Sequence, residues 1–260
     1  MKSNIIRAAL TKGPYIIYSY FSWMIRYSKH KEKYPIEKKY AALQKLVKQV
    51  NAGLGIEMHV IGKNNLPDTA SCLISNHLSG TDPLTILSEI DSPTTFVCKK
   101  EVKKIPFVAK CVDTTEGEFI DREDLKESLR TMMKVEADLK KGTKNWLIYP
   151  EGTRNKDDRK LLLPFHHGTF RPAFKSQVPI VPICIYGTQR VISTKYKFKK
   201  YDVYMEIGKP LYYEDYKDMK TQEIAELVQS KIQTMLSYHA RRKDRDMLIN
   251  LLGDKYKESY

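Results

Sequence analysis

The sequence predicts an α/β fold preceded by a basic pair of amphipathic helices. From Ile56 onward, short apolar runs of strand length alternate with segments of helical periodicity, which is the pattern of an α/β sheet. The residues before Ile56 instead form two helical segments rich in lysine and aromatic side chains. At 260 residues the chain fits one α/β domain with an appendage better than two equal halves. We therefore expect an N-terminal unit of residues 1–52 and an α/β domain of residues 53–260, divided near Gly53-Leu54-Gly55.

The first N-terminal segment, residues 13–25, carries no charged side chain and is rich in tyrosine, with Trp23 near its end. As a helix it would span about 20 Å, which is short of the roughly 30 Å hydrocarbon core of a bilayer. The basic residues that follow from Arg26 contain no small-residue cleavage site of the kind that ends a signal peptide. Aromatic side chains flanked by lysine and arginine are typical of a helix in the membrane interface. We expect this segment to lie on a bilayer without crossing it.

The second N-terminal helix is predicted at residues 36–51. Its apolar side chains recur at helical spacing, at Ile36, Tyr40, Leu43, Val47 and Val50. The lysines Lys38, Lys39, Lys45 and Lys48 fall on the other faces. Two interpretations remain open: this helix belongs to the membrane-seating pair, or it simply packs against the domain with a solvated lysine face.

The α/β part is defined by apolar runs that we assign to strands at residues 56–60, 70–76, 94–98, 146–149, 180–186 and 203–207. Helices are clearest at residues 123–141 and 221–238. In sheets built this way the active groups gather at the strand ends. The polar residues that follow the strands are therefore the candidates for a functional site.

Charge and cysteine usage narrow the class of protein. The net charge is +14, and residues 1–50 contain eleven basic and only two acidic side chains. Such a field attracts anionic partners, and by itself it leaves nucleic acid, acidic phospholipid and a phosphorylated substrate open. The four cysteines form no CxxC pair, so buried thiols of a reducing compartment are favoured over a zinc site or a disulfide framework.

One polar turn, residues 74–83, contains a histidine five positions before an aspartate. The strand at residues 70–74 runs into it, and Asp82 followed by Pro83 predicts a helix that starts there with Asp82 as its N-cap. An imidazole can accept a proton near neutral pH, and a carboxylate on its other nitrogen fixes the tautomer and stabilises the imidazolium. His77 and Asp82 are therefore candidates for a catalytic base and its partner, although a loop histidine beside a capping aspartate would give the same spacing.

Two further segments end on an arginine after a short apolar element. They are residues 117–122, ending at Arg122, and residues 149–154, ending at Arg154. A guanidinium matches the geometry of a phosphate, and small neighbouring residues let backbone N–H groups approach it as well. Each arginine taken alone is equally explained by solvation or by an ion pair, such as one from Arg122 to Glu123 or Asp124.

The order of these blocks resembles a known family. His77 with Asp82, then residues 117–122, then 150–154, then 178–183, resemble the four ordered blocks of the glycerolipid acyltransferases, and most closely the 1-acylglycerol-3-phosphate acyltransferases. The resemblance covers residues 56–208 and implies a mixed sheet flanked by helices. The N-terminal pair of helices also resembles the membrane-seated two-helix unit of the bacterial members. Tyr149 stands where phenylalanine is common, and isoleucines replace some valines of the last block.

The resemblance implies a direct acyl transfer without a cofactor or metal. His77 would act as general base on the sn-2 hydroxyl of lysophosphatidate, which would attack an acyl thioester carried by coenzyme A or acyl-carrier protein. Arg122 and Arg154 would hold the acceptor's phosphate. The other residues implied at this site are Glu151, Gly152 and Thr153, with Lys100 or Lys99 adding charge. A last group, Val178, Pro179, Ile180, Val181 and Pro182, would pack a strand beside the acyl site.

The expected partners are therefore a phospholipid surface, lysophosphatidate and the thioester donor, with no nucleic acid. The expected location is the cytoplasmic face of the cell membrane, as a peripheral or monotopic protein. The sequence leaves open the donor's carrier, the preferred chain length and whether another glycerolipid or lysophospholipid is the acceptor.

Two other classes of protein compete with this interpretation. A metal-dependent phosphohydrolase could use His77, Asp82 and the adjacent His166-His167, but the sequence offers no HExxH or similar ligand spacing. A non-catalytic basic module that docks on membranes would explain the charge. It would give no reason for the His77 turn or for the two arginine blocks.

Overall fold

The computed structural model describes residues 3–156, 160–194 and 198–252. Its centre is a mixed sheet whose strands, in the described part of the chain, lie in the order β1-β7-β6-β2-β5-β3-β4. The strands are β1 (Ile56–Ile61), β2 (Cys72–Ser75), β3 (Thr94–Lys99), β4 (Glu118–Ile120), β5 (Asn145–Ile148), β6 (Ile180–Tyr186) and β7 (Tyr201–Ile207). Neighbouring strands run parallel except β6 and β7, which are antiparallel. The expected α/β class with a mixed sheet is confirmed.

Strand β2 lies in the middle of the sheet and carries the turn that contains His77. Its Leu73 lies opposite Leu147 of β5 on one side and Val181 of β6 on the other. All four residues of β2 are buried, as expected for a parallel strand that is covered on both faces. Because β2, β5, β3 and β4 are parallel, their carboxyl ends meet at one edge of the sheet, and the residues that follow them converge there.

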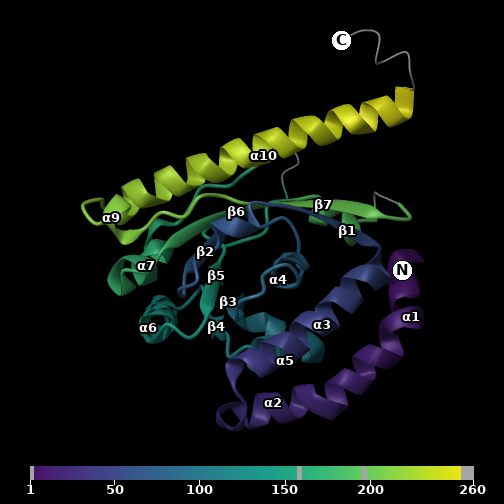
Figure 1. Cartoon of the computed structure of the whole chain (residues 1–260), viewed down its shortest axis with the longest axis horizontal. Helices are drawn as coiled ribbons and strands as arrows, with labels where there is room; N and C mark the ends of the chain where they lie inside the picture. Colours follow the sequence, from purple (N-terminus) through teal and green to yellow (C-terminus); the bar gives the residue numbers. More distant parts are fainter. Residues whose placement is uncertain (1–2, 157–159, 195–197, 253–260) are drawn as a thin grey trace.

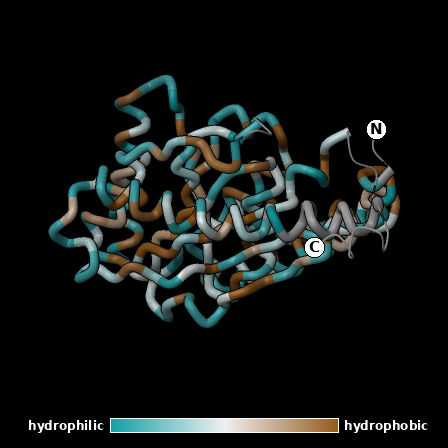
Figure 2. Tube along the Cα trace, turned by 90° about the horizontal axis from the view of Figure 1, so that it is seen from above, coloured by the Kyte–Doolittle hydropathy of each residue, from teal (hydrophilic) through white to brown (hydrophobic). Residues whose placement is uncertain are grey.

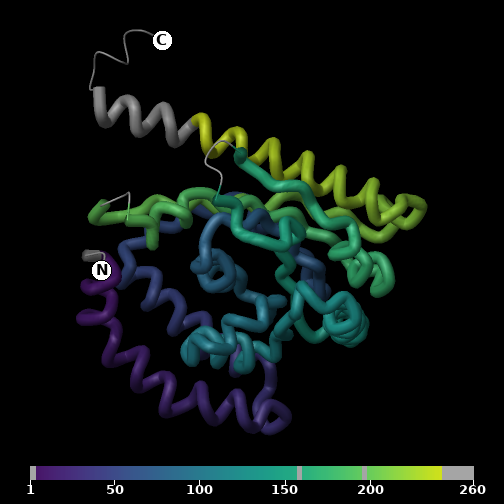
Figure 3. Tube along the Cα trace, turned by 180° about the vertical axis from the view of Figure 1, so that it is seen from behind, coloured from purple at the N-terminus to yellow at the C-terminus, as the bar shows by residue number. Residues whose placement is uncertain are grey.

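Helices cover both faces of the sheet (Figure 1). One apolar cluster joins α3 (Ile36–Leu54), α4 (Asp82–Leu87) and α5 (Pro106–Thr114) to residues such as Leu73 and Leu147. A second cluster on the other face joins α6 (Leu125–Lys141), α7 (Arg171–Ser176) and α10 (Thr221–Leu252) around Trp146. Viewed from behind, the N-terminal helices and α10 lie on opposite sides of the strands (Figure 3). The remaining short elements are η2 (Lys31–Lys33), η3 (Lys63–Asn65), η4 (Lys100–Lys104), η5 (His167–Phe170), α8 (Thr188–Val191) and α9 (Tyr213–Tyr216).

The N-terminal segment forms one long helical path, made of α1 (Ser3–Ser19), the π-helical turn η1 (Tyr20–Met24) and α2 (Ile25–Lys29). Trp23 and Ile16 on this path are half-buried and pack against the core, whereas other large apolar side chains point to solvent. The exposed ones are Ile6, Leu10, Ile17, Tyr18 and Phe21. Hydrophobic and hydrophilic residues alternate along the trace (Figure 2). Among the described residues, no helix has an apolar stretch long enough to span a membrane.

Lys39 is buried in the interior. One of the two interpretations of its helix gave the lysines a solvated face, but Lys39 is only 1% exposed. Its ammonium group pairs with the carboxylate of Glu116 and donates to the carbonyl of Lys31 at 2.8 Å. Glu116 also pairs with buried Lys144 at 3.2 Å, so an ionic network fastens α3 to the start of β4 and β5. The charge is tolerated in the interior because it is paired and hydrogen-bonded.

Several element boundaries also differ from those expected. Helix α3 continues to Leu54 and ends on Gly55 in the left-handed conformation, and α6 begins at Leu125 with Asp124 as its cap. Helix α5 was not predicted from the sequence. The N-terminal pair shares the apolar cluster of the sheet through Tyr40, Leu43 and Val47. The division at residue 53 stays a prediction.

Candidate active site

Asn76 fixes the end of β2 before the turn begins. Its side-chain amide donates to the carbonyl of Ile185 at 2.9 Å, and its carbonyl oxygen accepts the N–H of the same residue at 2.8 Å. The side chain is fully buried, so both hydrogen bonds are shielded from water. These two hydrogen bonds extend the pairing of β2 with β6 by one residue. The next residue, His77, therefore lies at the edge of the sheet.

The imidazole of His77 is held by the carboxylate of Asp82. The Nδ1 atom lies 2.8 Å from Oδ2 of Asp82, and the same oxygen accepts the backbone N–H groups of Leu78 at 2.7 Å and Ser79 at 2.8 Å. An oxygen that already accepts two N–H groups acts as an acceptor toward the ring too, so Nδ1 carries the proton and Nε2 has the free lone pair. Asp82 is completely buried, and the His77 side chain is 14% exposed.

The prediction that Asp82 caps the following helix is wrong by one position. Thr81 is the N-cap of α4, and Asp82 is its first residue. The carboxylate turns back into the loop and binds the N–H groups of the turn rather than those of the helix. Its fixed place at a helix N-terminus still favours the negative charge.

Tyr149 forms the floor under His77. The two rings stack with centroids 4.2 Å apart and planes 23° from parallel. Burial raises the pKa of the Tyr149 hydroxyl well above its ordinary value, and the negative charge of Asp82 acts in the same direction. The sequence pattern marks this tyrosine only as a departure from phenylalanine. The stack restricts the rotation of the imidazole together with the Asp82 bond.

Glu151 connects the His77 turn to the loop after β5. One carboxylate oxygen accepts the backbone N–H of His77 at 2.6 Å, and the other accepts the N–H of Leu163 at 2.9 Å. Glu151 is 3% exposed. Burial raises its pKa to about 7 and the charge of Asp82 adds to this, whereas the two N–H donors lower the pKa. Glu151 therefore holds the backbone at His77 and Leu163 through its two oxygens.

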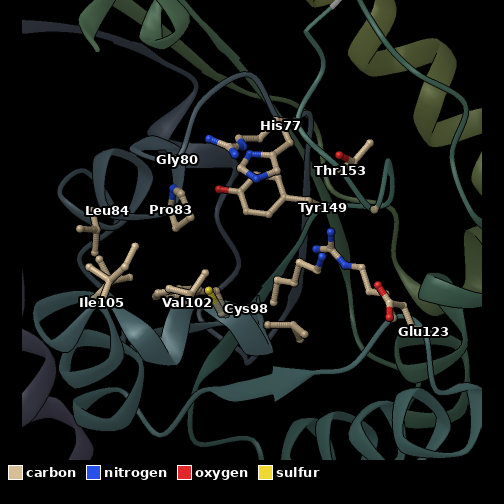
Figure 4. Close-up of a pocket in the computed structure, with 17 residues that line it drawn as sticks. His77, Gly80, Pro83, Leu84, Cys98, Val102, Ile105, Glu123, Tyr149 and Thr153 are labelled. Atoms are coloured by element: carbon tan, nitrogen blue, oxygen red, sulfur yellow. The ribbon is translucent and has the colours of Figure 1, made fainter. Parts of the chain in front are cut away.

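The turn opens into a cavity of about 540 Å³, which we call the His77 cavity (Figure 4). Its polar end contains His77, Arg122, Gly152, Thr153 and Arg154. The apolar residues of its lining include Leu84, Val102 and Ile105, which lie together on the side away from Thr153. The sequence placed both arginines at one site, and the structure brings both to the edge of this cavity.

The two arginines have no ion pair with an acidic residue in the described part of the chain. The carboxylate of Asp124 instead caps α6, because its Oδ1 atom accepts the backbone N–H groups of Lys126 and Glu127. The guanidinium of Arg154 lies against Gly80 of the catalytic turn, 3.7 Å from where a Cβ would stand. Two exposed guanidinium groups beside an imidazole form a site that suits a phosphorylated substrate.

The predicted lysines and histidines are divided between the cavity and other places. Lys100 does not line the His77 cavity and pairs with Asp121, whereas Lys99 lines the cavity and pairs with Glu101 at 3.1 Å. His167 lies 3.4 Å from the hydroxyl of Thr221, away from His77. In the described ranges no three His, Cys, Asp or Glu side chains lie close enough together to share a metal ion.

The block at residues 178–182 lies behind the site. Ile180, Val181 and Pro182 belong to β6, which pairs with β2, and none of the five residues lines the His77 cavity. Val181 and Ile180 are fully buried on opposite faces of the sheet. This block therefore supports the strand that carries His77.

Comparison with known proteins gives the family. The family model described as Acyltransferase matches residues 57–186, which is half of the chain. The chain belongs to the acyltransferase family. The match contains all four sequence blocks on which the resemblance rested, so that resemblance is confirmed.

Individual relatives carry a more specific name. A 1-acyl-sn-glycerol-3-phosphate acyltransferase of Saccharomyces cerevisiae is 32% identical over 181 residues, covering 69% of this chain and 59% of the relative. The enzyme of the same name from Escherichia coli is 33% identical over 120 residues, covering 46% of this chain and 48% of the relative. The matched part thus spans about half of these relatives.

A solved structure supports the fold. The crystal structure of the 1-acyl-sn-glycerophosphate acyltransferase PlsC from Thermotoga maritima aligns with a TM-score of 0.68. It covers 91% of this chain and 96% of its own, at 22% sequence identity. The two proteins share their architecture over nearly the whole chain.

Proposed function

We propose that this chain transfers a fatty acyl group from an acyl thioester to the sn-2 hydroxyl of 1-acylglycerol 3-phosphate, which gives phosphatidate. The observation that carries the proposal is the His77 cavity. It combines an imidazole oriented by Asp82 with two arginines that have no acidic partner in the described ranges and with an apolar wall. The names of the relatives support the same acceptor.

The reaction needs one proton to move twice. The Nε2 atom of His77 takes the proton of the acceptor hydroxyl while its oxygen attacks the thioester carbon, and Asp82 stabilises the imidazolium that forms. The tetrahedral intermediate then expels the thiolate, which receives this proton from His77. An ester bond forms, a thioester bond breaks, and the histidine returns to its neutral state.

The substrate's phosphate would lie beside Arg122 and Arg154. Both guanidinium groups are at the edge of the His77 cavity, and a charge-assisted hydrogen bond from each would fix the glycerol with its hydroxyl toward the imidazole. The donor's acyl chain starts at the carbonyl that reacts at His77. We therefore place that chain along the apolar wall of the same cavity, formed by Leu84, Val102 and Ile105.

The N-terminal path would bring the site to its substrates, whose chains reside in membranes. The exposed side chains Leu10, Ile17 and Phe21 are 76%, 60% and 70% exposed, and they share a helical path with Arg7 and Arg26. Apolar side chains beside basic ones suit the boundary of a bilayer that contains anionic lipid. We propose a peripheral or monotopic seat on the cytoplasmic face of the cell membrane.

The direct test is a product analysis. The purified chain is incubated with lysophosphatidate and either acyl-coenzyme A or acyl-carrier protein, and the lipids are identified by mass spectrometry. Phosphatidate that carries the donor's acyl group at sn-2 is expected with one of the two donors or both. Acylation of another lysophospholipid in place of lysophosphatidate would move the proposal to a different acceptor, and the absence of any acylated lipid would contradict it.

A further inference from the structure

A second cavity adjoins the His77 cavity, and no step of the proposed reaction uses it. It has a volume of about 460 Å³ and we call it the α6 groove. Its floor is formed by Val97, Ile120 and Ile148 of the sheet, and its wall by Leu125, Leu129 and Met132 of α6. Its polar lining comes mostly from the segments that follow β4 and β5, including Arg122, Glu151, Thr153, His166 and Thr169, and α6 adds Ser128. The apolar part of the groove is the sheet floor together with the leucine and methionine side chains of α6.

The two cavities lie on opposite faces of the sheet. Successive residues of a strand point to opposite faces, so Phe96 and Cys98 of β3 pack with the apolar cluster on the α5 side, whereas Val97, between them, packs with the cluster on the α6 side and lines both cavities. The side chain of Ile148 belongs to the apolar cluster on the α6 side. The cavities meet at the edge of the sheet, where both are lined by Val97, Arg122, Tyr149, Gly152 and Thr153.

The wall of the α6 groove exposes apolar surface to solvent. Leu125 is 74% exposed and Leu129 is 44% exposed, one helical turn apart on the same face of α6. A row of large apolar side chains along a cavity is more typical of a binding site for an apolar ligand than of an ordinary solvent-exposed surface. The entrance to this row is next to Arg122.

We propose that the α6 groove binds the acyl chain of the acceptor, at the sn-1 position of the lysophosphatidate. This inference rests on the proposed function, which requires two substrates that each carry a long acyl chain. The donor's chain begins at the carbonyl that reacts at His77 and so occupies the cavity that contains His77. The acceptor's chain is attached to the same glycerol as its phosphate, and Arg122, which would bind that phosphate, lines the α6 groove as well as the donor's cavity.

The arrangement explains why the site needs both faces of the sheet. Two chains that entered one cavity would compete for the same apolar wall. Separate cavities that join at Arg122 and Thr153 let the glycerol bridge the sheet edge, with its sn-2 oxygen directed to His77. The groove then contributes affinity in proportion to the number of methylene groups that the acceptor buries in it.

The proposal is tested by filling the groove. Leu129→Trp places a larger ring in its wall, and kcat/KM is measured for acceptors that carry a palmitoyl or a hexanoyl chain. We expect a loss of roughly tenfold or more with the palmitoyl acceptor, because several methylene groups lose their place, and a much smaller loss with the hexanoyl acceptor. Met133→Trp is the matched control, since Met133 lies on the same helix, is 58% exposed and does not line the groove.

A second measurement uses the unmodified protein. A lysophosphatidate with a photoreactive diazirine at the end of its acyl chain is bound and irradiated, and the labelled peptide is identified. Labelling within residues 125–132 is expected. Labelling at Leu84, Val102 or Ile105 of the His77 cavity, or on α1, would overturn the assignment.

The outcomes separate this inference from the proposed function. A wild-type protein that forms no phosphatidate from either acceptor would refute the proposed function. An active wild type whose Leu129→Trp variant loses equal activity with both acceptors, or loses activity according to the length of the donor's chain, would refute only the α6 groove as the site of the acceptor's chain.

Discussion

The Oδ2 atom of Asp82 lies 2.8 Å from Nδ1 of His77 and at the same time accepts the backbone N–H groups of the two residues that follow the histidine. One buried carboxylate oxygen thus fixes both the shape of the turn and the tautomer of the imidazole. The carboxylate has a structural and an electrostatic role, and substitutions can separate them.

Asp82→Asn keeps an oxygen that can accept all three hydrogen bonds but removes the negative charge. We expect the turn to stay folded while kcat falls on the order of 10- to 100-fold, because the imidazolium loses its counter-charge. Asp82→Ala also leaves two N–H groups of the turn without a partner, which costs about 1–3 kcal/mol for each buried group. Steady-state kinetics combined with urea unfolding checks both. Equal stability of the two variants would argue against the structural role.

Arg154→Ala should weaken the handling of the acceptor. Loss of a charge-assisted hydrogen bond removes about 1.5–3 kcal/mol of binding free energy in the transition state. The value of kcat/KM for lysophosphatidate should therefore fall roughly 10- to 100-fold, with little change in the KM of the donor. Arg130→Ala on α6 is the matched control, since Arg130 is exposed and lines neither cavity. A defect confined to the thioester would reassign Arg154 to the other substrate.

Glu151 should make the stability of the protein depend on pH. Its pKa rises from 4.5 to about 7 on folding, so the folded state favours the protonated carboxyl. The resulting contribution to stability is complete below the unfolded pKa and is lost as the pH rises through about 7. Glu151→Gln has no such titration. The free energy of unfolding of wild type minus that of the variant should fall by roughly 2–3 kcal/mol between about pH 5 and about pH 8.

Chemical denaturation at several pH values measures this difference. A constant difference between wild type and Glu151→Gln across the range would show that the carboxyl does not titrate there. A difference that grows with pH would reverse the sign and require an ionised carboxylate that is stabilised by folding.

Phe21 should contribute to membrane binding through burial rather than charge. Phe21→Ser removes an exposed ring whose burial in the membrane contributes about 1.5–3 kcal/mol of binding free energy. The partition coefficient onto vesicles of anionic phospholipid should therefore fall roughly tenfold or more. The loss should persist at high salt, which screens the basic residues but not the apolar contact. Tyr238→Ser is the control, because Tyr238 is exposed and its helix α10 lies on the opposite side of the sheet from α1 and α2 (Figure 1). Co-sedimentation that changes equally in both variants would contradict this seat.

Most strands could be predicted, either as a run of apolar residues, as at residues 180–186, or as an alternating pattern, as in β7. The three-residue strand β4 was not predicted, because so short a segment has no clear period. The order of the strands could not be predicted, since the pairing of β2 with both β5 and β6 joins segments far apart in the chain. Lys39 illustrates the same limit. Helical periodicity cannot show that a lysine will be buried when its partner, Glu116, comes from a distant loop.

Within the candidate site, the spacing of His77 and Asp82 made them candidate partners but fitted a loop histidine beside a capping aspartate equally well. The order of the four blocks favoured the pairing, and the structure brings the two side chains to 2.8 Å. The sequence motifs also indicated Arg122 and Arg154, and both line one cavity. The stack of Tyr149 under His77 and the α6 groove were not foreseen. Both depend on which strands are neighbours in the sheet, and the one local signal was that Tyr149 ends the strand beside β2.

The central claim is that His77 is the base of an acyl transfer to lysophosphatidate. The most direct measurement is the rate of phosphatidate formation by His77→Ala, with circular dichroism and vesicle binding recorded on the same sample. We predict a fall on the order of 10²–10⁴ in kcat with folding and membrane binding unchanged. Near-normal turnover by folded His77→Ala would contradict the account.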